Sequence, residues 1–382
     1  MLLVILAIGA GVESVPGVPG HDGAALSAEL LGSDAGAVGS KISPFSGSPH
    51  GPCSEIESRY GVGNGLLKDN QIGFYASAWP TYQALDAFSL TSLSAHDARC
   101  SRDLYRTLEA VDANYWSRGV SGMPAAFDQG PAAMHLPSDL PRVDDSLWLG
   151  ISLIGAYEGT KRRAFLKRAE GVFALGRANW DPRKGGIYWE DHGPGATDYE
   201  KAVVSNAPEA VIGVELYRLT GRPSYLGFAE RILSWLRSHL LDRSDGLYND
   251  HLDDHHSPAR VDHAQYTYDQ GIMVGLLALL SRVAPRTYPL TDAVSLARRA
   301  MGYFRAHHSY GSPSFDAVWA RNLLWAAGLY HEPSFTSEAR GSVKAAIKAE
   351  PKHPGGLLEV SSEIALRDLS KLPPGDYVRL GP

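Results

Sequence analysis

Residues 203–241 read VVSNAPEAVIGVELYRLTGRPSYLGFAERILSWLRSHLL, and this stretch decides the fold class. Apolar residues recur at helical spacing on both sides of a Gly-Arg-Pro break, which predicts two helices, Val203 to Thr220 and Ser224 to Leu241. A break this short makes the two helices antiparallel neighbours. The first helix is apolar nearly all round and the second is amphipathic with a charged face. This contrast is typical of a buried helix that is covered by a half-exposed one.

The same two-helix unit recurs on both sides of this stretch. Short breaks at Gly159-Thr160 and at Ala284 to Pro289 separate further pairs. A recurring unit of this kind indicates an array of hairpins that must stack to bury its faces, and a closed toroid with an inner and an outer ring is one solution. The other predicted helices are Gly73–Ser89, Cys100–Arg118, Val143–Glu158, Lys161–Asn179, Tyr266–Val283, Leu290–His307, Phe315–Tyr330, Thr336–Lys348 and Leu358–Leu369. The fold class is therefore all-α.

The longer connections follow the predicted outer helices and precede the next inner ones. They are Gly119 to Arg142, Trp180 to Ala202 and Asp242 to Gln265. Long ordered loops in a compact domain usually carry function. We therefore expect a cleft at the end of the toroid where the inner helices begin.

Composition excludes several classes of protein. Hydrophobic residues make up 44% and charged residues 20% of the 382 positions, so the chain is not largely disordered. A net charge of −6 is unlike the basic field of a nucleic-acid binder, so no nucleic acid is expected as a partner. The sequence also has no Ser-His-Asp elbow, Walker loop or dinucleotide fingerprint, which argues against serine chemistry and nucleotide use.

The beginning of the chain differs from the rest. Leu2 to Ile8 is apolar and is followed by small residues, like a secretory signal without its basic region, although a buried N-terminal strand is the alternative. We predict a signal-like segment at residues 1–20, a flexible Gly/Ser/Pro-rich lead-in at 21–71 and a helical domain at 72–382. The apolar run is too short to span a membrane. A secreted or cell-surface protein is expected.

Two cysteines, Cys53 and Cys100, are the whole thiol content of the chain. This number excludes a disulfide framework. A single bridge between the N-terminal loop and an early helix remains open.

Asp144 and Asp145 are adjacent carboxylates that open an apolar inner helix. One interpretation is that they cap free N–H groups and complement the helix dipole, which stabilises a helix by roughly 0.5–2 kcal/mol. The other is that they act as the two carboxylates of a glycosidase, one ionised and one protonated. The residues alone leave both interpretations open.

Four motifs in order make the chain resemble glycoside hydrolase family 76 from about residue 72 to 370. The motifs are Asp144-Asp145-Ser146-Leu147-Trp148, Gly185-Gly186-Ile187-Tyr188-Trp189, Lys201 to Pro208, and Tyr266-Thr267-Tyr268-Asp269-Gln270-Gly271. The resemblance implies an (α/α)6 barrel and a retaining endo-α-1,6-mannanase that acts on mannan or mannan-like glycans without a cofactor or metal. It also implies that Asp144 is the nucleophile and Asp145 the general acid/base. The chain departs from the family in having only Trp148 as an aromatic after the pair, and in a short sixth hairpin.

The same motifs supply candidate sugar-binding residues. Trp148, Tyr188 and Trp189 offer aromatic faces for stacking on pyranose rings, although Tyr188 and Trp189 fit a hairpin core equally well. Asn206 lies at the start of an inner helix, where an N-cap role is the simpler interpretation. The remaining candidates open the fourth inner helix: Tyr268, Asp269, which fits a cap as well, and Gln270. Trp79 and Tyr82 are expected in the core.

The segment from His251 to His263 contains metal-ligand residue types. Its spacing lacks the tight repeats of zinc sites, and a solvated loop is the preferred interpretation over calcium or sugar binding.

Three rival functions remain. A transglycosidase of the same fold would pass mannose to a sugar acceptor. A non-catalytic mannan-binding protein would use the Asp pair only as caps, and a sugar epimerase or uronyl hydrolase would use a similar toroid. Oligomeric state, endo or exo action and the natural glycan do not follow from the sequence.

Overall fold

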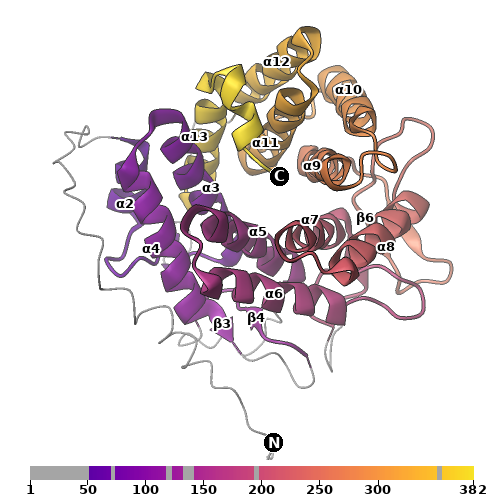
Figure 1. The fold of residues 1–382 in the computed structure, drawn as a ribbon, viewed down its shortest axis with the longest axis horizontal. Helices are drawn as coiled ribbons and strands as arrows, with labels where there is room; N and C mark the ends of the chain where they lie inside the picture. Colours follow the sequence, from indigo (N-terminus) through magenta and orange to yellow (C-terminus); the bar gives the residue numbers. More distant parts are fainter. Residues whose placement is uncertain (1–50, 70–73, 118–122, 132–141, 193–197, 351–354) are drawn as a thin grey trace, which may run out of the picture. The chain divides into compact units, whose positions relative to one another are not determined.

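An inner ring of helices forms the centre of the computed structural model, which describes residues 51–69, 74–117, 123–131, 142–192, 198–350 and 355–382 (Figure 1). Each inner helix packs against the next, and the last packs against the first, so the ring is closed. The inner helices are α3 (Ala78–Ala95), α5 (Val143–Thr160), α7 (Val203–Thr220), α9 (Thr267–Val283), α11 (Pro313–Tyr330) and α13 (Leu357–Lys371). Together with an outer layer they make an (α/α)6 barrel.

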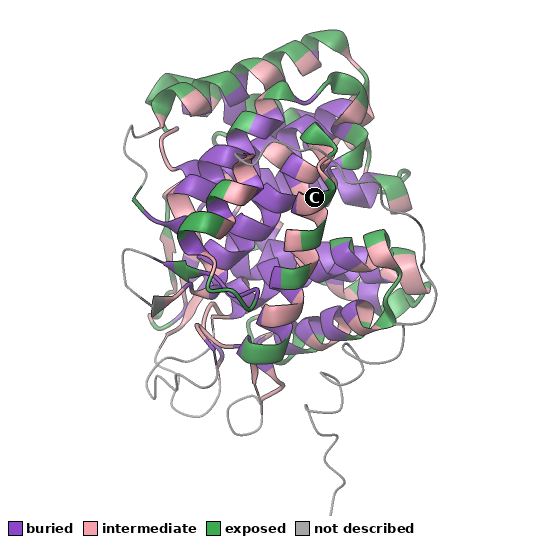
Figure 2. Ribbon diagram, turned by 90° about the vertical axis from the view of Figure 1, so that its left-hand side faces the viewer, coloured by how far each residue is buried: buried purple, intermediate pink, exposed green. Residues whose placement is uncertain are grey.

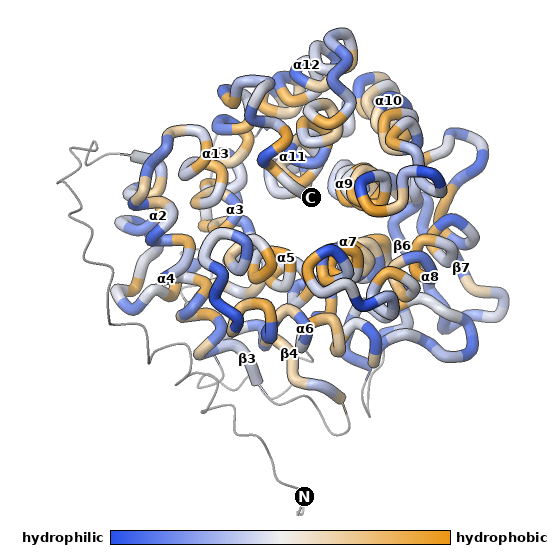
Figure 3. Tube along the Cα trace, viewed as in Figure 1, coloured by the Kyte–Doolittle hydropathy of each residue, from blue (hydrophilic) through white to orange (hydrophobic). Residues whose placement is uncertain are grey.

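The outer helices cover this ring. They are α2 (Pro52–Tyr60), α4 (Ala98–Tyr115), α6 (Arg163–Ala178), α8 (Pro223–His239), α10 (Leu290–His307) and α12 (Pro333–Ala349). Buried residues gather in the inner helices, and the outer helices carry the exposed ones (Figure 2). Figure 3 colours the same trace by hydropathy, and the buried side chains of the outer helices, such as Leu108, Phe165 and Leu233, are apolar. The predicted contrast between all-apolar and amphipathic helices is confirmed.

Three hairpins turn through the same local geometry. Lys161, Gly221 and His331 each follow an inner helix with positive φ angles of 60°, 71° and 55°. Each donates its backbone N–H to the carbonyl oxygen four residues earlier. A left-handed residue at this position ends a helix and satisfies one of its last carbonyls. The outer helix then begins after one further residue, which keeps the pair antiparallel.

All eleven predicted helices are present, with ends that differ by a few residues. Val203–Thr220 and Leu290–His307 have the predicted bounds, whereas the first inner helix begins at Ala78 rather than Gly73. The predicted lead-in is wrong in its last part, because Pro52–Tyr60 forms α2. The signal-like segment and the lead-in up to residue 50 lie outside the described residues.

Helix α2 takes the place of the missing outer helix of the sixth hairpin. It packs against α3, α4 and α13, at the point where the ring closes. Its side chains Cys53, Ile56 and Tyr60 enter a buried cluster with Phe88 of α3 and Val360 of α13. The Tyr60 hydroxyl donates to the carbonyl oxygen of Gly356 at 3.2 Å, directly before α13. The chain after α13 makes a 3₁₀ helix, η2 (Pro374–Arg379), that packs on α11.

A disulfide joins Cys53 of α2 to Cys100 of α4. The two cysteines are 47 residues apart in the sequence, so the bridge ties the closing helix to the first complete hairpin. Disulfides persist in oxidising compartments.

The described strands are short and lie in the connections between helices. The largest sheet has the order β5–β6–β7 and is antiparallel, with Lys201 opposite Leu252 and Leu252 opposite Val261. The strands are β1 (Lys68–Asp69), β2 (Phe74–Tyr75), β3 (Trp116–Ser117), β4 (Ala126–Phe127), β5 (Glu200–Ala202), β6 (His251–Asp253) and β7 (Arg260–Asp262). Within the described ranges, no helix has the length and apolar character needed to cross a membrane.

We expect removal of the disulfide to destabilise the barrel. Replacing both cysteines by serine should lower the free energy of unfolding by about 4 kcal/mol, because a loop of this length gains that much chain entropy when it is opened. Denaturant unfolding of the native and double-serine proteins would measure the difference. Each single serine variant serves as the control and should lose as much stability as the double variant. A double variant as stable as the native chain would show that α2 is held by packing alone.

Candidate active site

Two loops dock on the beginnings of inner helices through the same backbone contact. After α6, the carbonyl oxygen of Trp189 accepts a hydrogen bond from the N–H of Val143 at 2.8 Å. After α8, the carbonyl oxygen of Asp250 accepts from the N–H of Val203 at 2.9 Å. Each bond satisfies a first-turn N–H that has no partner within its helix. Trp189 and Asp250 are therefore held at equivalent places beside the starts of α5 and α7.

Two buried amides hold these loops in register. The Asn206 side chain accepts from the backbone N–H of Ile187 at 2.9 Å and donates to its carbonyl oxygen at 3.1 Å. The Gln270 side chain makes the same two bonds with Tyr248, at 2.9 and 2.7 Å. Both amides are fully buried. Their prediction as sugar ligands is wrong, because these amide groups hold loop backbone rather than facing the mouth of the barrel.

Asp144 and Asp145 lie in the first turn of α5. Asp145 is 8% exposed, and its Oδ2 accepts from Nε2 of Gln129 at 2.7 Å. Asp144 is half-buried, with a buried Oδ1, and accepts a hydrogen bond from the side chain of Trp189. The two carboxyl groups therefore have different donors from different loops.

Burial governs the protonation of this pair. Burial, and then repulsion from Asp145, raises the pKa of Asp144 well above its usual range, against the hydrogen bond from Trp189. Burial also raises the pKa of Asp145 to about 6, against the hydrogen bond from Gln129 and the charge of Arg142. Two close carboxyl groups of this kind titrate as a unit. One proton on the pair near neutral pH is the consequence.

Arg142 braces the loop that carries Trp189. Its guanidinium is ion-paired with Glu190 and lies over the indole of Trp189, 4.3 Å from the ring centroid. A cation over an aromatic face is attracted by the ring quadrupole. The indole that donates to Asp144 is thereby fixed in direction.

An aromatic group from α9 and α11 lies near the pair. Tyr268 stacks on Phe315 with ring centroids 3.9 Å apart, and Tyr266 meets both rings edge-on. Burial, and then the charges of Asp269, Asp250 and Asp144, raises the pKa of Tyr268. The prediction that the fourth inner helix shares a rim with the Asp pair is therefore supported for Tyr268.

Asp269 follows Tyr268 but is fully buried. Burial, followed by the charge of Asp250, raises its pKa well above the usual range. Full burial of Asp269 corrects its prediction as a direct sugar ligand.

Trp148 is also buried, with 2% of its surface exposed. Its ring lies 5.1 Å from that of Tyr82 and 5.7 Å from that of Trp79. Tyr82 belongs to the core as predicted, whereas Trp79 is only half-buried. The prediction that Trp148 offers a face to sugar is corrected: its buried ring packs against Trp79 and Tyr82.

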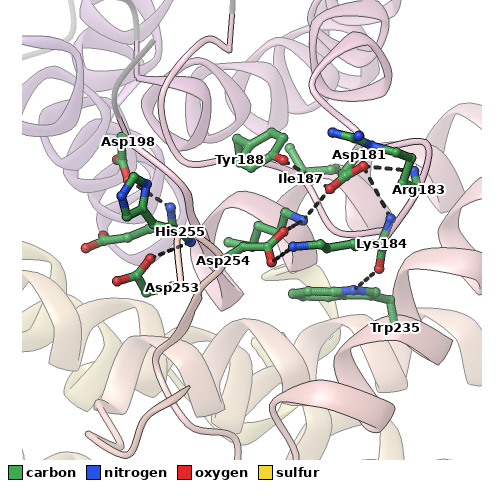
Figure 4. Close-up of polar contacts among 12 residues, drawn as sticks. Asp181, Arg183, Lys184, Ile187, Tyr188, Asp198, Trp235, Asp253, Asp254 and His255 are labelled. Carbon is green, nitrogen blue, oxygen red and sulfur yellow. Dashed lines mark hydrogen bonds and ion pairs between the residues drawn. The ribbon is translucent and has the colours of Figure 1, made fainter. Parts of the chain in front are cut away.

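Tyr188 points away from its neighbour Trp189 into an ionic network. Its hydroxyl donates to Oδ2 of Asp181 at 3.0 Å, and its ring stacks on His192. The fully buried ammonium of Lys201 binds Asp181 at 2.9 Å and Asp254 at 2.7 Å. Figure 4 shows Tyr188, Asp181 and Asp254 converging between the loop after α6 and the β6–β7 hairpin. Lys201 thus joins these two loops, and Tyr188 packs against its ammonium group. The role of Tyr188 as a sugar ligand remains a prediction.

The histidine-rich segment makes pairwise contacts. His251 Nδ1 lies 2.7 Å from Oδ2 of Asp250, and His256 Nε2 lies 3.2 Å from Oδ2 of Asp253. Among the described residues, no three metal-ligand side chains are grouped so that they would hold an ion.

Comparison with known proteins identifies a family that the chain resembles. The sequence model of glycosyl hydrolase family 76 matches residues 132–317, which include the Asp pair and the start of α9. This region of the chain matches glycoside hydrolase family 76. The family model ends in α11, so the last hairpins and α2 lie outside the matched region.

The curated relatives that this chain resembles include yeast proteins. Mannan endo-1,6-alpha-mannosidase DFG5 of Saccharomyces cerevisiae is 28% identical over 250 residues, 61% of this chain and 51% of that protein. Mannan endo-1,6-alpha-mannosidase DCW1 of Candida glabrata is 29% identical over 147 residues, 36% of this chain and 33% of that protein. The chain therefore spans about half or less of the length of these relatives.

Solved structures of bacterial family members share the fold. The GH76A alpha-1,6-mannanase of Salegentibacter sp. HEL1_6 superimposes with a TM-score of 0.68 at 18% identity, covering 84% of this chain and 96% of that one. A GH76 alpha-mannanase of Bacteroides thetaiotaomicron gives 0.70 at 18% identity, over 86% and 95% of the two chains.

Sequence reasoning missed three residues of this site: Gln129, Asp250 and Lys201. Gln129 lies in one of the long connections that were expected to be functional, but nothing in its neighbours marks it. Asp250 occupies the same position beside the start of α7 that Trp189 occupies beside the start of α5. Only the backbone hydrogen bonds reveal this equivalence. Lys201 was part of a family motif, and its burial between two carboxylates depends on the meeting of two loops.

The Lys201 network permits a test with a matched pair of variants. Lys201→Met should lower the free energy of unfolding by about 3–5 kcal/mol, because it leaves two buried carboxylates without their cation. Lys184 binds the same Asp254 at 2.6 Å but its side chain is 60% exposed. Lys184→Met should therefore cost at most about 1 kcal/mol. Urea unfolding of both variants compares them, and equal losses would contradict the buried network.

Proposed function

We propose that the protein is a retaining glycoside hydrolase that cleaves α-1,6-mannosidic linkages in mannan or a mannan-like glycan. The observation that carries this proposal is the adjacent Asp144–Asp145 pair in the first turn of α5, where each carboxyl group has its own donor and burial raises both pKa values. Retaining glycosidases need one ionised carboxylate and one carboxylic acid at the same bond. Two carboxylates that only capped the helix would be stabilised in their ionised form, so raised pKa values do not fit a capping role alone.

The proposed reaction has two steps. In the first, the Asp144 carboxylate forms a bond to C1 of the mannosyl unit while the C1–O bond to the leaving sugar breaks, and Asp145 donates its proton to that oxygen. In the second, the Asp145 carboxylate takes a proton from water, whose oxygen bonds to C1 and releases Asp144. After the second step Asp145 is protonated and Asp144 is ionised again, so both residues are in their starting states. The reaction needs no cofactor.

The roles within the pair are proposed from the family resemblance. In the ligand-free protein the larger rise in pKa falls on Asp144, because its carboxyl group is buried and lies beside Asp145. As the leaving group departs, positive charge develops at C1 of the sugar and stabilises an ionised Asp144. The proton that the pair shares therefore moves to Asp145. The hydrogen bond from Trp189 then stabilises the Asp144 carboxylate.

The proposed substrate class comes from the relatives. DFG5 and DCW1 are named mannan endo-1,6-alpha-mannosidases, and an inactive variant of the Salegentibacter enzyme with two consecutive aspartates replaced has been solved with alpha-1,6-mannotetrose. Near the pair, Tyr266 is 42% exposed, which leaves its ring free to contact a sugar. We propose secretion or surface display, which the Cys53–Cys100 disulfide supports. The proposed domain organisation is a signal-like segment, a lead-in shorter than predicted, and the barrel.

The first test compares Asp144→Asn and Asp145→Asn on linear α-1,6-mannan. Each variant should be at least about 100-fold slower than the native protein, a loss of about 2.7 kcal/mol of transition-state stabilisation. Added azide should restore cleavage with inversion in Asp144→Asn and with retention in Asp145→Asn. Equal melting temperatures provide the folding control. Short oligomannosides support hydrolysis, and longer products with an added acceptor would indicate a transglycosidase. Absence of cleavage by the native protein would contradict the proposed activity.

The pH profile gives a second test. Since the pKa of Asp145 is raised to about 6, the pair takes up a second proton below that value, and kcat/KM should fall about tenfold per pH unit as the ionised carboxylate is lost. Gln129→Leu removes the hydrogen bond that stabilises the ionised form of Asp145. The acidic limb of this variant should therefore move to higher pH. An unmoved limb would show that a group other than Asp145 sets it.

A further inference from the structure

His251, the first residue of β6, lies between two carboxyl groups. Its Nδ1 is 2.7 Å from Oδ2 of Asp250, which directly precedes β6. Its Nε2 is 3.6 Å from Oε1 of Glu200 in β5. The imidazole is largely buried, with 18% of its side chain exposed. Each ring nitrogen therefore faces a carboxyl oxygen, and the two oxygens come from different segments of the chain.

This arrangement favours the charged form of His251. A neutral imidazole has one N–H and one lone pair, and only the imidazolium donates from both nitrogens. In the neutral ring, a lone pair would face one of the two carboxylates and be repelled. The hydrogen bond to Asp250, and with it the charges of Glu200, Asp250 and Asp262, raises the pKa of His251, whereas burial opposes the rise.

The other groups around His251 are acidic on balance. Beyond its two partners, the titratable groups on the surrounding described strands and loops include Asp198, Asp253, Arg260, Asp262 and Tyr266. Asp262 is the cross-strand partner of His251, whereas Arg260 lies opposite Asp253. The side chain of Lys201 alternates to the other face of β5, where two carboxylates bind its ammonium. These neighbours stabilise an imidazolium at position 251.

The Glu200 end of this contact leads to the Asp144 site. The carbonyl oxygen of Glu200 accepts a hydrogen bond from the backbone N–H of Trp189 at 2.9 Å. The carbonyl oxygen of Trp189 in turn accepts from the N–H of Val143 at 2.8 Å. Val143 directly precedes Asp144. A continuous series of backbone hydrogen bonds therefore runs from Glu200 to the first turn of α5.

The Asp250 end leads to the next inner helix. The carbonyl oxygen of Asp250 accepts from the N–H of Val203 at the start of α7, at 2.9 Å. The same residue thus binds α7 through its backbone and His251 through its side chain. Through His251, the segment docked on α7 is connected to the segment docked on α5.

We propose that His251 is a positioning residue whose imidazolium joins the Asp250 and Glu200 carboxylates, and so holds the loop that carries Trp189 in place beside Asp144. Loss of the charge releases Glu200 and with it the support of this loop. The part of this inference that concerns catalysis rests on the proposed function. The ionic link between the two segments does not.

The first test uses two variants of His251. His251→Asn keeps a donor for Asp250 but cannot carry charge, and His251→Arg is charged at every pH and has donors for both carboxylates. Because the pKa of His251 is raised on folding, its stabilisation is fully present below about pH 6.5 and is lost as pH rises through the folded value. From about pH 5.5 to about pH 9, the melting temperature of the native protein should fall relative to His251→Asn by at least about 1 °C.

Over the same range the native protein should also lose stability relative to His251→Arg. This comparison decides the question if His251→Asn does not fold. A constant gap to either variant would overturn the proposal. His256→Asn is the matched control, because His256 has one carboxylate partner, Oδ2 of Asp253 at 3.2 Å, and its side chain is 39% exposed. An exposed pair contributes little, so its gap should change by less than about 1 °C. An equal change in both gaps would overturn the assignment to His251.

Nuclear magnetic resonance of ¹⁵N-labelled imidazoles observes the proton directly. The His251 signals are those that disappear in either His251 variant. As pH rises, both nitrogens should stay protonated beyond about pH 6.5, the midpoint of an unperturbed histidine. A midpoint at or below that value would overturn the proposal.

Kinetics on α-1,6-mannan test the positioning role. At pH 6, kcat of His251→Asn should be at least about fivefold below that of the native protein with KM within about twofold, and His251→Arg should recover most of the loss. The ratio of His251→Asn to native kcat should rise at least about threefold from pH 6 to pH 9, because the native protein then loses its own imidazolium. A ratio that stays constant would overturn the positioning role, since lost packing alone has no such pH dependence. If the native protein does not cleave mannan, the proposed function fails, while the melting and resonance results still decide whether the ionic link exists.

Discussion

The structure depends on the need to cover inner helices that are apolar on every face. Such a helix is stable only when neighbours surround it, so six of them close into a ring and require an outer layer. Five outer helices come from the hairpins themselves, and the sixth position is filled by α2 from the start of the described chain. Ile56 and Tyr60 bury the outward side of α13, and the bridge from Cys53 to Cys100 joins the two ends of the ring.

Closure of the ring also creates the candidate site. Because hairpin turns are short at one end, the long connections meet at the other, where the inner helices begin. Buried carboxyl groups lie in the first turns of three of these helices, at Asp145, Asp269 and Asp316. A helix N-terminus favours ionised carboxylates, but burial acts in the opposite direction for all three. Neighbouring groups therefore set each state: an amide donor beside Asp145, a backbone N–H and a hydroxyl donor beside Asp316, and a negative charge near Asp269.

The periodic parts of the structure were predictable from the sequence. Helical spacing located each of the eleven predicted helices, and family motifs located the Asp pair. The errors share one cause: polar or aromatic residues at helix starts were assigned to sugar, whereas Asn206 and Gln270 hold loop backbone and Trp148 packs under Trp79. A helix start looks the same in sequence whether its side chains face a ligand or a loop. Helix α2 was missed because its nine residues follow a Gly/Ser/Pro-rich stretch.

The sequence by itself determined the class of fold, the hairpin order and the position of the two consecutive carboxylates, because each depends on residues that are close together in the chain. Tertiary structure decided which helix closes the ring, which indole and amide meet Asp144 and Asp145, and that His251 meets Glu200. These contacts join residues from different loops. Their protonation follows from burial and from the donors around them, and both exist only once the ring has closed.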